Sequence, residues 1–432
     1  MEHDIEYIGK EMDKVVEQIV NNNLHAALVG CWKLLDPSDN LPFFQEQEYA
    51  ALNENEDSPY QKQKKRVDEA LWADEPLLIR NLPREYPLAL LEVLDDYLYK
   101  YFDCPAGLTP LPYVLLDGET YVIRRRVLQR SMDTAHASKT GHLQRWLRHH
   151  WIVPARISSI EIRIRSTHGR TYNAIRLLEN GEFKVYVGSF PDGVGPLWLN
   201  DDPAKWSARE ITEPETRWSS VSEALEEALA AGAAVVVLPE LTICPILRRR
   251  VRDWLDDHPD HPFILVLPGS FHEEKDGKVF NIAELVNYSG YPLLHHRKLT
   301  RFGTKEKLEG IVTGSHIELL DTSIGLIGIP ICLDFCEEGN VFNSLWETIG
   351  AECLLVPAFG WDTSIHAHLS RAGELFRKHG TVSIIANQHP EGKDQDHGFV
   401  YEKALRHDEP PAYATRGCRT FTVKINPSGS DK

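Results

Sequence analysis

The sequence predicts an α/β sandwich built on mixed sheets and preceded by a mainly helical domain. Three patterns carry this prediction: apolar residues at helical spacing near the start of the chain, an alternating polar and apolar stretch around residue 160, and short apolar runs that then alternate with helical segments. The chain has 432 residues, which is too long for one ordinary hydrophobic core, so we expect two or three domains.

The first 150 residues carry the signals of helices. The segment "LALLEVLDDYLYKYF", residues 88–102, repeats apolar residues at steps of three and four, as one face of an amphipathic helix requires. We therefore predict a mainly helical domain over residues 1–150, and these patterns do not indicate its function. The same spacing relates the apolar residues nearest the start of the chain: Ile8, Met12, Val15, Val16, Ile19 and Val20.

The pattern changes after residue 150. The stretch "ISSIEIRIR" alternates isoleucine with charged residues, which is typical of a half-buried strand, and we assign residues 151–180 to a β-rich connector. Beyond it, the helical segment "SSVSEALEEALAAG" ends at Gly232 and the buried run "AAVVVLPE" follows, which together with the preceding strand indicates a βαβ unit. Similar runs continue as far as "TVSIIANQ". We predict an α/β domain over residues 181–425 and a tail over 426–432.

One segment of the predicted α/β domain looks like a long loop. It runs from Pro191 to about Arg217, and a loop of that length is unusual in a compact domain. We expect it to be either a lid over the active site or an insertion that faces a partner.

The composition excludes several classes of protein. Hydrophobic residues make up 42% and charged residues 26% of the chain, which are values of a globular protein, and no apolar run is long enough to cross a membrane. The start of the chain lacks the basic and apolar regions of a secretory signal, so we expect a cytoplasmic protein. The formal net charge of −17 argues against nucleic-acid binding, although arginines crowd the stretch from Arg124 to Arg165. The seven cysteines form no metal-type pair and are too sparse for a disulfide framework.

Three predicted strands each end on a group that can react. Glu240 follows the apolar run in "VVVLPEL", Lys298 follows the run in "YPLLHHRKL", and Cys332 follows the run in "IGIPICLDF". The ends of strands in an open α/β sheet are where ligands bind, because side chains there leave the core on a rigid support. Taken singly, the three could be a loop carboxylate, a surface lysine and a buried thiol. Together they supply an acid, a cation and a nucleophile, which are the parts of covalent acyl transfer.

The chemistry assigns a role to each group. A thiol attacks only as a thiolate, so Cys332 needs a base, which Glu240 could supply. Attack on the carbon of an amide or nitrile builds negative charge that Lys298 would stabilise. Glu240 would then protonate the leaving amine and activate the water that hydrolyses the thioester. These steps require no metal and no organic cofactor.

The order Glu240, Lys298, Cys332 and the motifs around these residues resemble the nitrilase superfamily, also called carbon-nitrogen hydrolases. The resemblance spans residues 181–425 and implies an αββα sandwich and an amidase-type hydrolase that cleaves a non-peptide C–N bond. Further residues agree with the pattern of that family: Asp334 two places after the cysteine, "LLVPAFGW" ending on Trp361, Arg371, Ala372 and Glu374 on a helix, and Asn387 at a strand end. Among these, Asp334 and Trp361 are predicted to contact the substrate.

The resemblance also implies a second glutamate between the lysine and the cysteine. Glu306 and Glu309 stand eight and eleven residues after Lys298, which are the two spacings that the family uses. Glu309 is favoured because the family-like turn "IVTG" follows it closely. The late "hGxSxIidPxG" element of the family survives only as "DHGFVYEKALRHDEPP", and Leu333 stands directly after the cysteine. The substrate therefore cannot be carried over, and neither can the choice between hydrolysis and acyl transfer.

A second hypothesis stays open beside the enzyme. The chain could be a catalytically silent or partner-activated nitrilase-like module that acts as a binding or scaffold protein, with its N-terminal domain recognising a protein partner. We also predict a homodimer, because the segment "HLSRAGELFRKHG" has more apolar residues at helical spacing than packing on one sheet requires: Leu369, Ala372, Leu375 and Phe376. The alternative is that all four pack within the chain.

Overall fold

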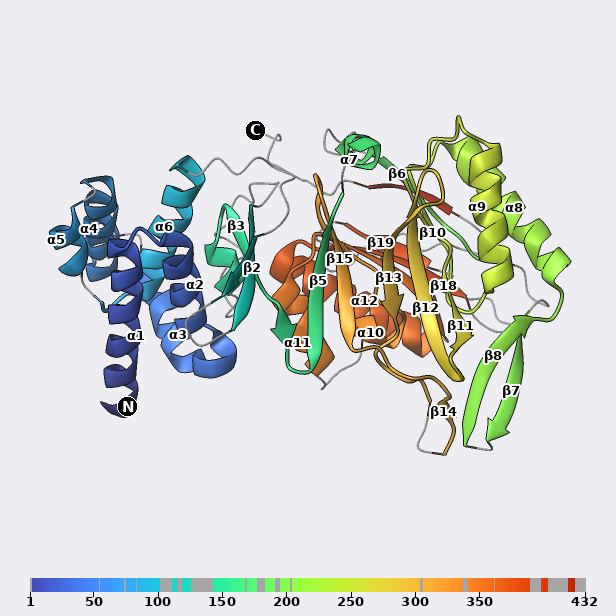
Figure 1. Cartoon of the computed structure of the whole chain (residues 1–432), viewed down its shortest axis with the longest axis horizontal. Helices are drawn as coiled ribbons and strands as arrows, with labels where there is room; N and C mark the ends of the chain where they lie inside the picture. Colours follow the sequence, from blue (N-terminus) through green and yellow to red (C-terminus); the bar gives the residue numbers. More distant parts are fainter. Residues whose placement is uncertain are drawn as a thin grey trace. The chain divides into compact units, whose positions relative to one another are not determined.

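The chain divides into two compact units, Met1–Ala155 and Arg156–Pro427. Figure 1 shows the elements of both units in this computed structural model. No helix of the described chain has the length and apolar character needed to cross a membrane. The structure describes residues 2–53, 55–73, 75–82, 84–101, 111–114, 119–125, 143–167, 169–176, 183–190, 195–202, 204–303, 306–336, 341–360, 362–388, 398–402 and 419–423.

The first unit is mainly helical, as predicted. The apolar residues at helical spacing lie on α1, where Met12, Val15 and Val16 are each at most 4% exposed. A small antiparallel sheet of β1 (Leu111–Val114), β2 (Thr120–Arg125) and β3 (His150–Pro154) follows the helices. The helices are α1 (Glu2–Val20), α2 (Leu24–Leu34), α3 (Pro37–Ala51), α4 (Pro59–Ala73), α5 (Pro76–Arg80) and α6 (Pro87–Tyr101).

A buried carboxylate joins the last helix of this unit to its sheet. Asp95 on α6 is 1% exposed and accepts hydrogen bonds from the backbone N–H groups of Arg148, His149 and His150. Its Oδ1 also lies 2.8 Å from Nδ1 of His150. Because buried carboxylates are costly unless they are fully hydrogen-bonded, this set of donors fixes the start of β3 against α6.

The second unit contains two mixed sheets, each with seven strands in the described part of the chain. In the first sheet, β6, β9 and β10 run parallel to one another and the strands beyond them are antiparallel. Its strands are β6 (Phe183–Val187), β9 (Val235–Val237), β10 (Leu265–Leu267), β11 (Ser270–Lys275), β12 (Lys278–Asn287), β13 (Pro292–Arg297) and β20 (Arg419–Val423).

The second sheet is parallel at its centre. β16, β17 and β18 run parallel, and β15 pairs in parallel with β5. The alternating stretch around residue 160 forms β5, where Ile160 and Ile162 are buried. The strands are β4 (Arg156–Ile157), β5 (Ile160–Ser166), β15 (His316–Thr322), β16 (Gly325–Gly328), β17 (Cys353–Phe359), β18 (Val382–Gln388) and β19 (Gly398–Tyr401).

The two sheets face each other between layers of helices, so the predicted sandwich is confirmed (Figure 1). β17 and β18 contact β9 across the interface. Helices α8 (Pro214–Ala231) and α9 (Pro245–Asp257) share a hydrophobic core with the first sheet, and α12 (Asp362–His379) packs on β18 and β19. The short helices α10 (Leu333–Cys336) and α11 (Val341–Ile349) contact α12. All seven positions of β18 are buried, as expected of a strand covered on both faces.

The segment predicted as a long loop contains a hairpin instead. Its strands are β7 (Pro196–Asp202) and β8 (Lys205–Ile211), and β8 pairs in parallel with β14 (Leu308–Glu309). Tryptophans at 198 and 206 are residues that favour strands, and this signal outweighs the turn-forming residues around them. Figure 1 shows these three strands projecting from the sandwich. The hairpin thus pairs with the strand that carries Glu309.

Candidate active site

The end of β17 holds two of the predicted residues in place. The backbone N–H of Cys332 donates to the carbonyl of Pro357 at 3.0 Å, and that of Glu240 donates to the carbonyl of Ala358 at 3.2 Å. Glu240 follows β9 of the first sheet and Cys332 follows β16 of the second. Consecutive carbonyls of one strand therefore bring together residues from the two sheets.

Lys298 forms the centre of a buried ion-pair cluster. It directly follows β13, and its Nζ lies 2.8 Å from Oε1 of Glu240 and 3.0 Å from Oε2 of Glu309. The three side chains are at most 2% exposed. Asn281 on β12 donates from Nδ2 to Glu240 at 2.8 Å and to Glu309 at 3.1 Å. A buried lysine paired with two hydrogen-bonded carboxylates keeps its charge, and its pKa is raised well above the usual value because both glutamates outweigh the effect of burial.

Glu309 is the carboxylate that stays ionised. The backbone N–H of Ala208 donates to Nδ1 of His272, so a neutral His272 carries its proton on Nε2 and donates it to Glu309 at 2.7 Å. The backbone N–H of Phe302 donates to the other oxygen at 2.9 Å. Burial acts to raise the pKa of Glu309, but Lys298, His272 and the Phe302 N–H together lower it to about 2.

Glu240 is the more basic of the two carboxylates. Burial raises the pKa of Glu240, Lys298 opposes this effect, and the negative charge of Glu309 raises the pKa further. The pKa values of the two carboxylates that share Lys298 are thus shifted in opposite directions: that of Glu240 upward, and that of Glu309 downward. Such a separation is what acid–base catalysis needs, since a proton can then be exchanged at one site only.

Cys332 sits at a strained turn between β16 and α10. Its φ is +47°, a conformation that costs a side-chain-bearing residue about 1–3 kcal/mol. The residue is 3% exposed. Burial raises the pKa of its thiol and so does the charge of Glu240, whereas a hydrogen bond with His368 and the charge of Lys298 lower it. The resting thiol is therefore protonated and needs a base before it can attack.

His368 on α12 belongs to the same site and was missed by the sequence prediction. Its Nδ1 lies 2.6 Å from the carbonyl oxygen of Ser364, which can only accept, so Nδ1 carries a proton and Nε2 is the acceptor of the neutral ring. Nε2 lies 3.9 Å from Sγ of Cys336, and the ring stacks on Phe335 with centroids 5.8 Å apart. Although burial acts to lower the pKa of His368, interactions with Cys336 and Cys332 raise it well above the usual value. A histidine on a helix gives no sequence signal of such a contact.

The remaining predicted residues differ in their placement. Asp334 is buried, and its carboxylate accepts from the backbone N–H groups of Leu299 and Thr300 and lies 2.9 Å from Nε2 of His296. It thus fixes the backbone directly after Lys298. Glu306 is exposed, unlike Glu309. Trp361 lies outside the described residues. The predicted substrate contacts of Asp334 and Trp361 stay predictions.

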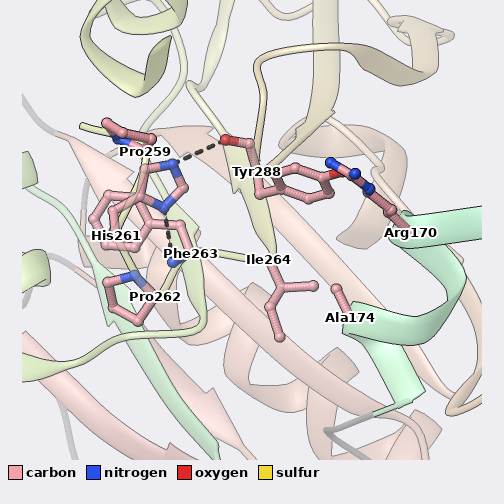
Figure 2. Close-up of a pocket in the computed structure, with 8 residues that line it drawn as sticks. All are labelled: Arg170, Ala174, Pro259, His261, Pro262, Phe263, Ile264 and Tyr288. Carbon is pink, nitrogen blue, oxygen red and sulfur yellow. Dashed lines mark hydrogen bonds between the residues drawn. The ribbon is translucent and has the colours of Figure 1, made fainter. Parts of the chain in front are cut away.

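A pocket of about 310 Å³ lies elsewhere in the second unit and is separate from this cluster (Figure 2). His261 lines it, but both ring nitrogens are engaged, one with the carbonyl of Tyr288 at 2.8 Å and the other with the N–H of Phe263 at 3.0 Å. The pocket has none of the three reactive residues in its lining. Among the described residues, His, Cys, Asp and Glu side chains form no group of three that could hold a metal ion.

The fold and this cluster define an α/β protein in which a buried thiol, an amine and two carboxylates come together where strands of two facing sheets end. More particularly, residues 208–336 match the model of the carbon-nitrogen hydrolase family, so the predicted resemblance to the nitrilase superfamily is confirmed over this segment. The matched segment is a little under a third of the chain and contains Glu240, Lys298, Glu309 and Cys332. No curated protein matches the sequence.

The solved structures similar to this chain include an amidase from Nesterenkonia sp., with 18% identity, a TM-score of 0.42, and coverage of 56% of this chain and 91% of the amidase. A mutant of the amidase from Nesterenkonia sp. AN1 carries the acetamide moiety of fluoroacetamide covalently added at its active-site cysteine; it is 18% identical with a TM-score of 0.42, covering 56% of this chain and 90% of its own.

Proposed function

We propose that this chain is an amidase-type hydrolase that cleaves a non-peptide C–N bond through a thioester at Cys332. One observation carries the proposal: the buried lysine shared by a basic and an ionised carboxylate, next to a thiol at a strained turn. The match of residues 208–336 to the carbon-nitrogen hydrolase family supports it. The substrate is a small amide, with a nitrile as the alternative.

The proposed reaction begins when Glu240 takes the proton of the Cys332 thiol. The thiolate sulfur attacks the carbonyl carbon, and the electron pair of the C=O bond moves to the oxygen, where Lys298 stabilises the negative charge. Glu240 then gives its proton to the nitrogen, the C–N bond breaks, and the amine leaves a thioester on Cys332. Glu240 next deprotonates a water that attacks the thioester carbon, so that the carboxylic acid and the free thiol are released.

Glu309 and His368 support these reaction steps without forming or breaking covalent bonds to the substrate. Glu309 stays ionised and holds Lys298 charged and in place, with His272 and Asn281 as its anchors. His368 acts on the nucleophile. Because Nδ1 is fixed by the carbonyl of Ser364, its Nε2 faces the thiols, and its positive form stabilises a thiolate at Cys332.

A second candidate, the partner-activated module, has one observation in its favour. Cys332, Glu240 and Lys298 are at most 3% exposed, so an amide reaches the thiol only after the site opens. Binding of a protein partner to the helical unit is one way to drive such an opening. In this candidate, purified chain alone would release no ammonia from amides.

A homodimer through α12 and a cytoplasmic location also belong to the proposal. Ala372 and Leu375 are fully buried within the chain, whereas Leu369 and Phe376 are partly buried. The ring of Phe376 lies 5.7 Å from that of Tyr401. An interface through this helix would therefore centre on Leu369 and not on all four apolar residues.

Ammonia release from a panel of small amides tests the proposed activity. We expect release by the unaltered chain and none above background by the Cys332→Ala variant, which removes the nucleophile and little volume. The Cys244→Ala variant is the matched control, because Cys244 is also buried but lies at the start of α9. Retention of a tenth or more of the rate in Cys332→Ala would overturn the covalent mechanism.

A further inference from the structure

The β7–β8 hairpin is built into the candidate active site. In the pairing of β14 with β8, Glu309 is the register partner of Trp206. The backbone N–H of Gly310 donates to the carbonyl of Trp206 at 2.7 Å, and the N–H of Ala208 holds the ring of His272, which in turn holds Glu309. The hairpin is therefore tied to the site at both a strand and a side chain.

Four aromatic rings of this region form a continuous set, which we call the aromatic collar: Trp198, Trp206, Phe302 and Phe359. Trp206 stacks on His272 with centroids 5.7 Å apart and meets Phe302 edge-on at 6.3 Å. Trp198 meets Trp206 edge-on at 5.1 Å and Phe359 at 6.2 Å. Trp198 on the hairpin thus links the pair Trp206 and Phe302 to Phe359.

Two residues of the collar are linked through the backbone to the residues of the candidate site. Phe359 directly follows Pro357 and Ala358, whose carbonyls hold Cys332 and Glu240. Phe302 donates its backbone N–H to Glu309. The backbones of two collar residues therefore belong to the same hydrogen-bonded framework that holds Cys332, Glu240 and Glu309, and the ring of Trp206 stacks on His272, which binds Glu309.

Packing of the hydrophobic core explains only part of the collar. Trp206 and Phe359 pack against the core of the second unit. Trp198 and Phe302, in contrast, are 41% and 37% exposed. Large aromatic side chains left this open beside a reactive site favour ligands that stack on them.

We infer that the aromatic collar binds an aryl or other flat apolar acyl group, so that the chain prefers aromatic amides to short aliphatic ones. This inference rests on the proposed function and names the substrate class of the same site. Trp198 is the residue on which the preference depends most, because it is the most exposed ring and contacts both Trp206 and Phe359.

The test compares alkylation of Cys332 by iodoacetamide and by its N-phenyl analogue iodoacetanilide. In both reagents the thiolate sulfur forms a bond to the CH₂ carbon and iodide leaves. The labelling rates can therefore be measured whether or not the chain hydrolyses amides. Peptide mapping by mass spectrometry gives the rate at Cys332, and each rate is divided by that of free N-acetylcysteine. We expect the unaltered chain to favour the phenyl reagent by about tenfold, as one good ring contact allows.

The Trp198→Ala variant should lose most of this preference, and a urea unfolding midpoint equal to that of the unaltered chain shows that the variant is folded. The Leu199→Ala variant is the matched control, since Leu199 lies on the same strand and is 37% exposed. Equal corrected rates for the two reagents in the unaltered chain, or a preference unchanged in Trp198→Ala, would overturn the inference. If ammonia assays show no amide hydrolysis while the labelling preference persists, the proposed reaction is wrong but the inference of an aryl-binding collar holds. If neither reagent labels Cys332, the proposed function and the inferred aryl-binding collar are both wrong.

Discussion

At the scale of single residues, one buried lysine serves two carboxylates that differ in basicity. Lys298 pairs with Glu240 and with Glu309 at nearly equal distances, yet only Glu309 has a further ring donor and a backbone N–H on its oxygens. Hydrogen bonds to an ionised carboxylate lower its pKa, and a like charge nearby raises the pKa of its neighbour. The asymmetry of the hydrogen bonds is therefore what leaves Glu240 free to exchange protons.

The Glu309→Gln variant should lose about a hundredfold in kcat, a typical loss for a group that supports acid–base catalysis. The reason is that Lys298 would lose one of its two counter-charges, and Glu240 would lose the neighbour that raises its pKa. Steady-state ammonia release measures the effect. Glu306→Gln, an exposed residue of the same region, should keep the rate of the unaltered chain. The reverse ranking would give the role to Glu306.

The His368→Gln variant should shift the reactivity of Cys332 to higher pH. His368 lowers the pKa of the Cys332 thiol, so without it a larger share of the thiol stays protonated at a given pH. The rate of iodoacetamide labelling at Cys332, measured from pH 6 to 10, should rise through a midpoint that lies about one unit higher. His366→Gln is the control, because His366 is exposed and two residues away. An unchanged midpoint in His368→Gln would rule out its role on the nucleophile.

At the scale of elements, the turn between β16 and α10 stores strain at the nucleophile. Cys332 has a φ of +47°, which glycine adopts without cost and other residues adopt rarely. The thiol at this turn lies within the electrostatic influence of Lys298 and Glu240, and the backbone N–H of Cys332 donates to the carbonyl of Pro357. The proposed role of Cys332 as nucleophile would account for a cysteine at a position that backbone conformation alone would give to glycine.

This strain predicts an inverted ranking of two substitutions. Cys332→Gly should unfold at higher urea concentration than Cys332→Ala, by about 1 kcal/mol in free energy of unfolding, because glycine relieves the strain. At Cys31, a buried cysteine inside α2, the order should be the opposite, since glycine in the interior of a helix costs about 1 kcal/mol relative to alanine. If Cys332→Ala proves the more stable of the first pair, the turn is not strained.

Several elements and residues follow from the sequence for clear physical reasons. Apolar spacing predicts α1 and α6, and continuous apolar runs predict β9 and β18, because burial on one or both faces leaves a local pattern. Glu240 and Lys298 are found from the sequence because Glu240 stands where the apolar run of β9 stops and Lys298 directly follows β13. The structure places their side chains 2.8 Å apart.

Other parts of the site could not be predicted, because their partners lie far away in the sequence. His272 is 37 residues from Glu309, and His368 is 32 residues from Cys336. Each lies on a regular element, where an isolated histidine has no distinguishing pattern. The β7–β8 hairpin is a different case: the turn-forming residues around it led to the expectation of a loop, although Trp198 and Trp206 favour strands.

At the scale of the whole molecule, the candidate site is built from one of the two units only. Glu240, Lys298, Glu309, Cys332 and His368 all belong to Arg156–Pro427. The helical unit has its own core and its own buried network around Asp95. The chemistry should therefore tolerate changes that weaken the helical unit.

The Asp95→Ala variant tests this separation. It should lower the free energy of unfolding of the helical unit by about 3 kcal/mol, because three backbone N–H groups and His150 would lose their buried acceptor. Ammonia release by the variant should match that of the unaltered chain at temperatures where both are folded. Asp96→Ala is the control, since Asp96 is 35% exposed and its pair with His149 contributes less. Loss of activity in Asp95→Ala alone would make the helical unit part of the enzyme.

The measurement that tests the central claim most directly is the mass of the chain during turnover. The chain is mixed with an amide that it hydrolyses. The mixture is quenched in acid at successive times and analysed by intact mass and by peptide mapping. The thioester mechanism predicts one acyl group, carried by the peptide that contains Cys332, absent in Cys332→Ala and released by hydroxylamine as a hydroxamate. Transfer of the acyl group to any other residue, or hydroxamate formation that persists in Cys332→Ala, would contradict it.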